Sequence, residues 1–432
     1  MRVIVVGGGA VGLCVAEALT TRGAEVTVFE RDRCGAGASA GNAGWITPSL
    51  AIPVPGPGVI GQSLRWLVNP SGPLWIRPTL SPAMLAWTAR FVASCRGSAY
   101  RRGLAALQQA GALAGPAFDR LAERGVEFEL HNAPLLYPAF EQAELEHLRG
   151  VADELIGVGA APLLEEISAA ELRAVEPALS ERVLGGLIAR VDRRVRPESF
   201  CDGLRRAVVA GGAEVLEHSG VAALGREGTG WMVSGGGTRR SGDAIVLAGG
   251  VASAGLLSRL GVRLPIVAAK GYSRTYPSDE TGPHQAMYLE TPKVAISAYD
   301  GVVRVSGTLE LGARGLGLSE GRLRAITAAA QQALPGWRMP SSPRDWAGMR
   351  SLSPDGLPFI GPVPGLQGLH VAAGHATLGI TLAPLTGELV ADLVLEGRRS
   401  GALTPFDPSR AIGGYFKPPR VMRPRATTGG PR

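Results

Sequence analysis

The chain opens with an ordered succession of apolar and glycine-rich segments. Residues 3–6 form a continuous apolar run, which is typical of a strand buried on both faces. Glycines follow, then a helix-like stretch that ends near Arg22, and then a second strand-like run, AEVTVFE, that ends at Glu30. Strand, turn, helix and strand in this order predict the start of a parallel α/β sheet.

Later patterns indicate that the chain leaves this sheet, forms a second unit and then returns to the sheet. The segment RSGDAIVLAGG, residues 240–250, is typical of another buried strand, so we expect the chain to return to the same sheet there. Before it, LEHLRGVADELIGVG places Leu148, Val151, Leu155 and Val158 on one face of a predicted helix. From Trp346 onward the pattern predicts strand, turn, short strand, glycine loop and long helix.

Composition and charge narrow the class of protein. With 432 residues, of which 45% are hydrophobic, the chain can bury a large core, as a globular enzyme does. The net charge is +7, but a C-terminal tail without acids holds Lys417, Arg420, Arg423, Arg425 and Arg432, which leaves +2 for the rest. Nucleic-acid binding needs clustered basic residues, so we exclude nucleic acid as a partner.

The cysteines and the apolar runs indicate a protein of the cytoplasm. Cys14, Cys34, Cys95 and Cys201 form no CxxC pair and have no suitably spaced histidine, so we expect reduced thiols and no metal site. The N-terminus is a predicted strand and not a signal peptide, and no apolar run reaches the length of a membrane span.

The first chemical signal is the glycine turn after the first strand. Gly7, Gly9 and Gly12 form a GxGxxG motif, in which the turn is tight, a pyrophosphate approaches bare backbone, and a helix start offers N–H groups to the anion. Glu30 lies eighteen residues after Gly12, where its carboxylate can accept hydrogen bonds from a ribose. The motif predicts a dinucleotide site and leaves NAD and FAD both open.

Further motifs decide in favour of FAD. In chain order they are GASAGNAGWITPS, VEPAL, KGYS, KVAISAYDGVVRVSGTLELG, MRSLSPDGLPFIG and GHATLG. With the glycine motif, this series resembles the D-amino-acid oxidase superfamily of FAD-dependent oxidoreductases along nearly the whole chain, and within it the bacterial D-amino-acid dehydrogenases most of all.

The resemblance implies an α/β fold with a Rossmann-like FAD-binding domain and a mixed-sheet α+β substrate domain. We expect the FAD domain to comprise residues 1–90, 181–262 and 346–412, the substrate domain to comprise 91–180 and 263–345, and a basic disordered tail to follow over 413–432.

The implied reaction is oxidative deamination of D-amino acids to 2-oxo acids and ammonia by hydride transfer to flavin N5. If the amine enters neutral, the chain needs no catalytic base of its own. Relatives that act on glycine, sarcosine or D-hydroxyproline are the alternative substrate classes. The resemblance favours a quinone or another electron acceptor over oxygen. Val305 agrees with this, because it stands where the aligned sarcosine oxidases carry an oxygen-activating lysine.

The resemblance also assigns residues to FAD. They belong to the first strand and its turn, the end of the second strand, the following loop, the middle strands and the late histidine loop: Val3, Ile4, Val5, Val6, Gly7, Gly8, Gly9, Ala10, Val11, Gly12, Glu30, Arg31, Ser39, Asn42, Ala43, Gly44, Val221, Gly249, Gly374, His375, Thr377, Leu378, Gly379, Ile380 and Thr381.

The late loop is expected to run beside the flavin ring and to lead into a helix that begins just before Pro384. A helix start carries partial positive charge, which favours the reduced, anionic flavin. His375 is predicted to add a hydrogen-bond donor there and to take no part in acid–base chemistry; a packing role for its ring is the alternative.

Arg350 is the predicted substrate anchor, because a guanidinium grips a carboxylate with two parallel hydrogen bonds. The alternative is a salt bridge between Arg350 and the nearby Asp355. Tyr272 is predicted to assist Arg350 or to line the pocket. Two residues depart from the family pattern, Ser351 in place of proline and Ala376 in place of a second glycine.

Residues 64–91 mix tryptophans with arginines and could lie on a bilayer, although repeated prolines favour packing against the protein's own core. Peripheral contact with the inner face of the cell membrane is therefore a secondary expectation. Two other functions stay open, an NAD-linked dehydrogenase and a flavin-holding subunit that works only within a larger complex.

Overall fold

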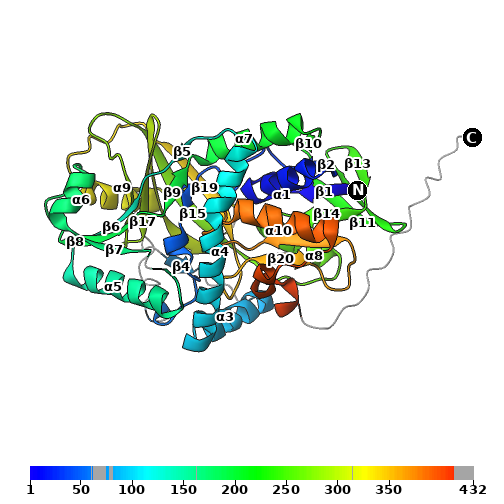
Figure 1. The fold of residues 1–432 in the computed structure, drawn as a ribbon, viewed down its shortest axis with the longest axis horizontal. Helices are drawn as coiled ribbons and strands as arrows, with labels where there is room; N and C mark the ends of the chain where they lie inside the picture. Colours follow the sequence, from blue (N-terminus) through cyan, green and yellow to red (C-terminus); the bar gives the residue numbers. More distant parts are fainter. Residues whose placement is uncertain (60, 62–73, 77–80, 162, 314, 413–432) are drawn as a thin grey trace, which may run out of the picture.

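Two β-sheets organise the molecule. The computed structural model describes residues 1–59, 61, 74–76, 81–161, 163–313 and 315–412. A six-stranded sheet lies at one end and a nine-stranded sheet at the other, and the long helix α4 (Gly97–Glu123) crosses the molecule between them (Figure 1).

The six-stranded sheet carries the predicted dinucleotide site. Its order is β10 (Glu214–Leu216), β2 (Glu25–Phe29), β1 (Arg2–Val6), β14 (Ala244–Leu247), β21 (Leu369–Ala373) and β20 (Phe359–Pro362). All neighbours pair in parallel except β20 and β21. The carboxyl ends of the parallel strands therefore meet at one edge, where open α/β sheets bind ligands.

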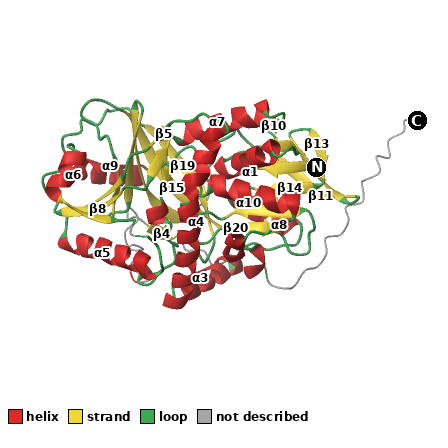
Figure 2. Ribbon diagram, viewed as in Figure 1, coloured by secondary structure: helices red, strands yellow, loops and turns green. Residues whose placement is uncertain are grey.

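Both faces of this sheet are covered, which explains why β14 and, from Val3 onward, β1 are continuously apolar. Helices α1 (Ala10–Thr21), α10 (Ala383–Glu396) and α4 share a core with one face, and α7 (Pro197–Ala210) packs against α1. The other face is covered by α8 (Val251–Arg259) and the meander β11 (Val221–Glu227), β12 (Gly230–Gly235) and β13 (Thr238–Gly242) (Figure 2).

The nine-stranded sheet is mixed. Its order is β19 (Arg344–Leu352), β15 (Val267–Pro277), β18 (Val302–Leu311), β17 (Val294–Tyr299), β16 (Ala286–Leu289), β6 (Leu135–Ala139), β8 (Gly185–Ala189) and β7 (Glu165–Ser168), with β4 (Leu74–Ile76) beside β18. The pairs β16–β6 and β18–β4 are parallel and the others antiparallel. Helix α9 (Glu320–Ala333) packs against one face.

Smaller elements complete the described chain. A three-stranded sheet of β3 (Trp45–Ile46), β9 (Arg193–Val195) and β5 (Leu130–His131) adjoins the nine-stranded sheet. Helices α3 (Pro82–Ser94), α5 (Gln142–Gly157) and α6 (Ala169–Val175), with the 3-10 turns η1 (Pro48–Leu50), η2 (Gly401–Phe406) and η3 (Pro408–Arg410), fill the remaining surface.

The predicted local elements are confirmed. Helix α1 ends at Thr21, and α10 starts at Ala383 with Pro384 in its first turn. Helix α5 buries Leu148 and Leu155 as expected, while Val151 is only partly buried. The two-domain α/β architecture with one mixed sheet is confirmed as well.

The sheets divide the chain differently from the predicted boundaries at residues 181 and 346. Strand β8 pairs with β6 and β7, so residues 185–189 lie in the nine-stranded sheet. Strand β19 pairs with β15 as far as Leu352, so the substrate sheet continues past residue 346. Helix α4, expected in the substrate domain, shares its core with α10 and β1. Apolar strands and helices look alike in sequence whichever core receives them.

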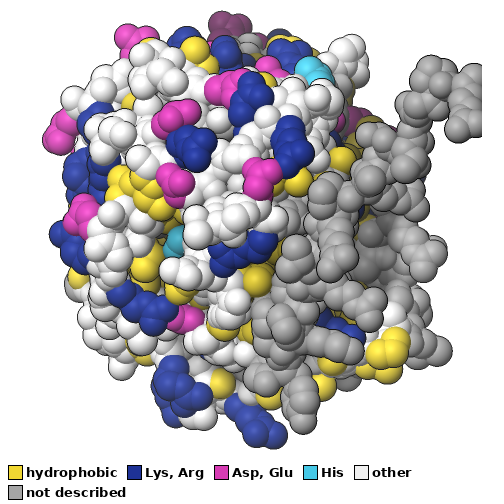
Figure 3. Space-filling view, turned by 90° about the vertical axis from the view of Figure 1, so that its right-hand side faces the viewer, with side chains coloured by type: hydrophobic (Ala, Val, Ile, Leu, Met, Phe, Trp, Pro, Cys, Tyr) yellow, Lys and Arg dark blue, Asp and Glu magenta, His cyan; other side chains and the backbone are white. Residues whose placement is uncertain are grey.

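Two surface features bear on possible partners. On the face shown in Figure 3, basic and acidic side chains are interspersed. Among the helices that the structure describes, none combines the length and the apolar character needed to cross a bilayer. The tail 413–432 lies outside the described residues.

Candidate active site

The glycine turn after β1 is shaped for close approach of a ligand. Gly7 has a positive φ of 113°, and a Cβ placed on it would lie 2.6 Å from the carbonyl oxygen of Ala248 at the end of β14. A Cβ on Gly12 would collide with the carbonyl oxygen of Gly7. These two positions therefore require glycine, and they bring β1, β14 and α1 together as tightly as a dinucleotide turn demands.

The start of α1 is open to an anion. Gly9 is the N-cap and has no side chain to cap the helix, and the first turn contains no acid. Backbone N–H groups in this turn lack intrahelical acceptors, and that of Ala10 donates to Ser39 Oγ at 3.1 Å. A helix start of this kind suits a pyrophosphate, so the residues present fit the phosphates of FAD.

Glu30 is fixed at the tip of β2. Its carboxylate accepts hydrogen bonds from the N–H groups of Gly8 at 2.6 Å and Asp32 at 2.9 Å. Each carboxylate oxygen has a second lone pair, so Glu30 can still accept from a ribose hydroxyl. Arg31 pairs with Asp32, is largely exposed and packs over Gly220, immediately before Val221. The structure thus brings Gly8, Glu30 and Arg31 to one edge of the sheet, next to Val221.

The residues of β1 that were assigned to FAD lie in the interior of the protein. Val3, Ile4, Val5 and Val6 are at most 5% exposed, and their side chains belong to the two cores that flank the sheet. The structure does not bring Val3, Ile4 and Val5 to a surface that a ligand could touch. They position the glycine turn, whereas Gly249 lies at the end of β14 directly beside Gly7.

The loop after Gly35 joins the two units. Arg304 of β18 donates to the carbonyl of Asn42 at 2.9 Å. The carbonyl of Ala43 accepts from Ser297 Oγ at 2.9 Å and from the hydroxyl of Tyr299. Gly44 has a positive φ of 68°, and a Cβ there would meet the carbonyl of Val195. Predicted cofactor residues Asn42 and Ala43 are therefore held against the nine-stranded sheet, and Gly44 is held against β9.

The histidine loop is anchored to the end of β19. Ser351 accepts from the N–H of Gly374 through Oγ at 3.3 Å and from the N–H of Ala376 through its carbonyl at 3.0 Å. Gly374 and Ala376 both have positive φ. The two departures from the family pattern, Ser351 and Ala376, are thus direct hydrogen-bond partners, and the loop lies beside Arg350.

His375 faces the helix that follows it. Its ring is 5% exposed, and Nε2 lies 3.1 Å from Thr386 Oγ1 on α10. Burial lowers the pKa of His375 to about 4, so the ring is neutral near pH 7. The observed side-chain contact is with the protein itself, and the contact of His375 with FAD stays a prediction.

The rest of this loop divides into exposed and buried positions. Thr377 is exposed and Gly379 partly so. Leu378, Ile380 and Thr381 are buried, and Thr381 donates to the carbonyl of Trp45 at 2.9 Å. Thr377 and Gly379 are therefore the loop residues best placed to touch a ligand directly.

Arg350 has no carboxylate partner among the described residues. Asp355, the alternative partner, instead receives hydrogen bonds from Arg410 at 2.8 and 3.2 Å. The guanidinium of Arg350 lies across Gly271 of β15. Burial lowers its pKa, and the phenol of Tyr288 partly offsets this effect. A desolvated guanidinium without a counter-ion is a ready receptor for a ligand carboxylate.

Tyr288 is a site residue that sequence reasoning missed. It lies on β16, with its ring edge-on to Trp45 at 6.0 Å and to Tyr137 at 6.3 Å between centroids. Burial raises the pKa of the phenol, with Glu290 acting in the same direction and Arg350 against it. The phenol stays protonated and can donate a hydrogen bond beside Arg350.

The structure does not bring Tyr272 to Arg350. Tyr272 pairs with Ala347, whereas Arg350 pairs with Ala269, and residues of opposite parity along a strand face opposite sides. The hydroxyl of Tyr272 donates to Glu310 at 2.7 Å in the core beside α9. The predicted carboxylate-assisting role of Tyr272 is wrong for this geometric reason.

Val305 also faces α9, so the position compared with an oxygen-activating lysine points away from Arg350. Its neighbours Arg304 and Ser306 lie on the other face, where Arg304 Nε donates to Thr275 Oγ1. The β18 residues adjoining Val305 on the side of Arg350 are therefore an arginine and a serine.

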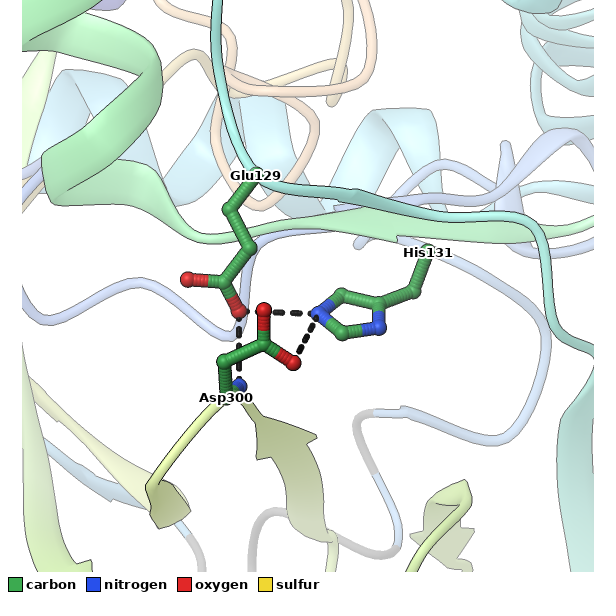
Figure 4. A group of neighbouring side chains, drawn as sticks. All are labelled: Glu129, His131 and Asp300. Atoms are coloured by element: carbon green, nitrogen blue, oxygen red, sulfur yellow. Dashed lines mark hydrogen bonds and ion pairs between the residues drawn. The ribbon is translucent and has the colours of Figure 1, made fainter.

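One group of described side chains has the spacing of metal ligands, Glu129, His131 and Asp300 (Figure 4). Glu129 Oε1 lies 2.8 Å from His131 Nε2 and accepts from the N–H of Asp300 at 2.8 Å, and Arg196 lies 3.4 Å from Oε2. These contacts tie β5 to the turn after Tyr299, whose hydroxyl supports Ala43. Through Tyr299, the group thus supports the loop that joins the two units.

Comparison with known proteins agrees with this geometry. The FAD dependent oxidoreductase family model matches residues 2–393. D-amino acid dehydrogenase of Xanthobacter autotrophicus is 32% identical over 405 residues, covering 91% of this chain and 95% of the relative. The enzyme of the same name from Vibrio vulnificus is 31% identical over 409 residues, covering 91% and 96%.

Solved structures are similar over the same extent. Glycine oxidase from Geobacillus kaustophilus superimposes with a TM-score of 0.74 at 25% identity, covering 95% of this chain and all of that one. L-proline dehydrogenase from P. horikoshii has a TM-score of 0.71 at 18% identity, covering 95% and 97%, and shares the fold. By its sequence, its two sheets and its glycine turn, the chain belongs to the FAD-dependent oxidoreductase family.

Proposed function

We propose that this protein oxidises D-amino acids to 2-oxo acids and ammonia, with FAD as the first electron acceptor. The observation that carries the proposal is Arg350, a partly buried guanidinium without a carboxylate partner among the described residues, and near enough to the phenol of Tyr288 for each group to shift the pKa of the other. An α-amino acid supplies the carboxylate that this pair lacks. Relatives that cover most of the chain are named D-amino acid dehydrogenase.

Bound FAD would supply the two-electron oxidation of the substrate's carbon–nitrogen bond. In the proposed site, the turn from Gly7 to Gly12 and the start of α1 hold the pyrophosphate, and Glu30 accepts from the ribose. The loop of Asn42 to Gly44 and the loop of Thr377 to Gly379 flank the ring system.

The substrate is oriented by two groups of the chain. Arg350 binds the carboxylate through parallel N–H donors, and Tyr288 adds an O–H donor. Fixing the carboxylate restricts where the α-hydrogen can point, which is the protein's main contribution to rate. His375 is neutral and faces Thr386, so we assign it no proton transfer.

Anaerobic flavin bleaching tests this proposal. We expect D-amino acids to bleach the holoenzyme and L-amino acids, glycine, sarcosine and D-hydroxyproline to do so at least tenfold more slowly. Arg350→Ala should keep the yellow cofactor and lose at least a hundredfold in kcat/KM. Bleaching by glycine or sarcosine alone would show that these amines, and not D-amino acids, are the substrates. A yellow protein that no amine bleaches would favour a flavin subunit of a larger complex.

We propose further that a quinone or another carrier takes the electrons from the flavin, as the name dehydrogenase indicates for the relatives. The expected result is rapid turnover with a soluble quinone analogue and slow oxygen consumption under the same conditions. Faster turnover with oxygen would identify an oxidase.

Helix α3 supports a peripheral membrane contact in this proposal. Trp87 is its buried residue, while Leu85 is 55% and Val92 46% exposed. The double variant Leu85→Asp, Val92→Asp should lose flotation with anionic lipid vesicles and keep activity with a soluble acceptor. Leu113→Asp, at a 44% exposed position on α4, is the matched control. Trp66, Arg65 and Arg77 of the predicted contact lie outside the described residues.

A further inference from the structure

A row of small residues crosses the sheet between two aromatic side chains. Ser273 pairs with Trp346 on one side and with Ser306 on the other. Ser306 pairs with Ala295, which in turn pairs with Tyr288. Residues directly opposite one another point to the same face, so the row lies on a single face of the sheet. This face is opposite to α9.

The two serines in this row have buried, unpaired hydroxyls. Ser273 is fully buried and Ser306 is 2% exposed, and neither Oγ has a hydrogen-bond partner in the described structure. Leaving a buried hydroxyl without a partner is unfavourable, and protein interiors avoid it. A pair of unpaired hydroxyls at paired positions of one face is therefore free to hydrogen-bond a ligand group.

The adjacent row provides an internal comparison. It contains Thr275 and Ser297, which lie on the same face of the same sheet. Thr275 Oγ1 accepts from Arg304 at 3.0 Å, and Ser297 Oγ donates to Ala43 at 2.9 Å. Hydroxyls beneath the joining loop are thus satisfied by protein, whereas those of Ser273 and Ser306 are not.

The position of these hydroxyls relative to Arg350 indicates which ligand group would reach them. Arg350 lies across Gly271, and Ser273 is two residues farther along β15 on the same face. Two residues of a strand span about 7 Å. A substrate whose carboxylate binds Arg350 could extend a short side chain along the strand toward Ser273. The side chain and one hydrogen bond of about 2.8 Å together cover this distance of two residues.

We propose that Ser273 and Ser306 form the side-chain subsite for the substrate and select D-amino acids with a short hydroxyl-bearing side chain, the class of D-serine. The inference rests on the proposed oxidation of D-amino acids. A serine hydroxyl both donates and accepts hydrogen bonds. One of the two serines can therefore donate to a substrate hydroxyl while the other accepts from it. An apolar side chain of the same size leaves both serines unpaired.

A matched substrate pair tests the subsite. D-serine and D-2-aminobutyrate differ by a hydroxyl in place of a methyl group, and the wild-type enzyme should favour D-serine by at least tenfold in kcat/KM. Ser273→Ala and Ser306→Ala should each reduce this ratio, and the double variant should bring it to about one. Thr20→Val is the control. Thr20 also has a buried, unpaired hydroxyl, but it lies on α1, which packs against the six-stranded sheet and not against the sheet of the two serines.

Product binding gives a readout without turnover. 3-Hydroxypyruvate should perturb the flavin spectrum of the wild-type enzyme at a dissociation constant at least tenfold below that of 2-oxobutanoate, and the double variant should lose this preference. Equal or inverted preference in the wild-type enzyme would overturn the subsite whatever the variants do. A preference retained by a folded double variant would overturn it as well. If neither amino acid reduces the flavin, the proposed function itself fails and the inference falls with it.

Discussion

Arg350 lies across Gly271 on the neighbouring strand, with its Nε 3.0 Å from the position that a Cβ on Gly271 would occupy. The absence of a side chain at Gly271 therefore sets where the guanidinium can lie. Since Arg350 has no ion pair in the described structure to hold it, its position depends on this packing.

Gly271→Ala should displace the guanidinium and raise KM for a D-amino acid about tenfold, with FAD content unchanged. Steady-state kinetics and the ratio of flavin to protein absorbance measure both quantities. Gly225→Ala is the matched control, because a Cβ on Gly225 of β11 would meet no atom within 4 Å. An unchanged KM in Gly271→Ala would show that Arg350 does not bind the substrate.

Tyr288→Phe should lower kcat/KM about tenfold, the usual effect of losing one hydrogen bond to a charged ligand. Combined with Arg350→Lys, the loss should be smaller than the product of the single losses, because both groups are expected to contact one carboxylate. Tyr272→Phe should leave KM unaltered and lower thermal stability, since Glu310 loses a donor. A higher KM in Tyr272→Phe would contradict the assignment of the two faces of the sheet.

Gly12→Ala should yield a protein with at least tenfold less FAD, because the new methyl group collides with the carbonyl of Gly7 and separates α1 from the turn. The flavin absorbance of purified protein and its midpoint of unfolding report the loss. Gly37→Ala, where a Cβ would have no neighbour within 4 Å, should bind FAD normally. Full FAD content in Gly12→Ala would exclude the turn from cofactor binding.

Acidification should destabilise the fold through His370. Burial lowers the pKa of this side chain to about 4, below its usual value near 6.5. At pH 5 the unfolded chain therefore binds a proton at His370 that the folded chain rejects, so this side chain lowers the free energy of unfolding by about 2 kcal/mol between pH 7 and pH 5. Urea unfolding at the two pH values should show that the variant His370→Leu lacks this contribution, so its change in free energy differs from that of the wild-type protein by about 2 kcal/mol.

The comparison with the variant isolates the histidine. His375, whose pKa burial also lowers to about 4, contributes a slope of the same sign to both proteins. Asp192, whose pKa is raised by burial to about 7, contributes the opposite slope to both, because its stabilising effect is lost as the pH rises. Equal slopes in wild-type protein and His370→Leu would show that the ring is protonated in the folded state.

Local patterns predicted the parts of the site that depend on neighbouring residues. The glycine turn follows from the spacing of Gly7, Gly9 and Gly12, and the close contact of Gly12 with the carbonyl of Gly7 lies within this local motif, whereas that of Gly7 involves Ala248 of a distant segment. Pro384 fixed the start of α10 because proline is tolerated only in a first helical turn. The resemblance supplied Arg350, and the structure removed its alternative partner by pairing Asp355 with Arg410.

Long-range pairing determined what sequence reasoning missed. Tyr288 reaches the site because β16 pairs with β17 and β17 with β18, and no local pattern specifies that order. Tyr272 was misplaced because a shift of one residue exchanges the faces of a strand. The contacts of Ser351 with Ala376 join residues 25 positions apart in the chain, so two apparent departures from the family pattern proved to be one local arrangement.

The order of strands in the six-stranded sheet has a consequence for biosynthesis. Val3 pairs with Ala244, and Ile245 pairs with Leu369, so the centre of the sheet joins both ends of the chain. Contacts of such high sequence separation make folding slow. The first strand leaves the ribosome with one edge unpaired and stays so until most of the chain has been translated. FAD capture is therefore a late event, and a nascent chain arrested before β21 exposes an aggregation-prone apolar edge.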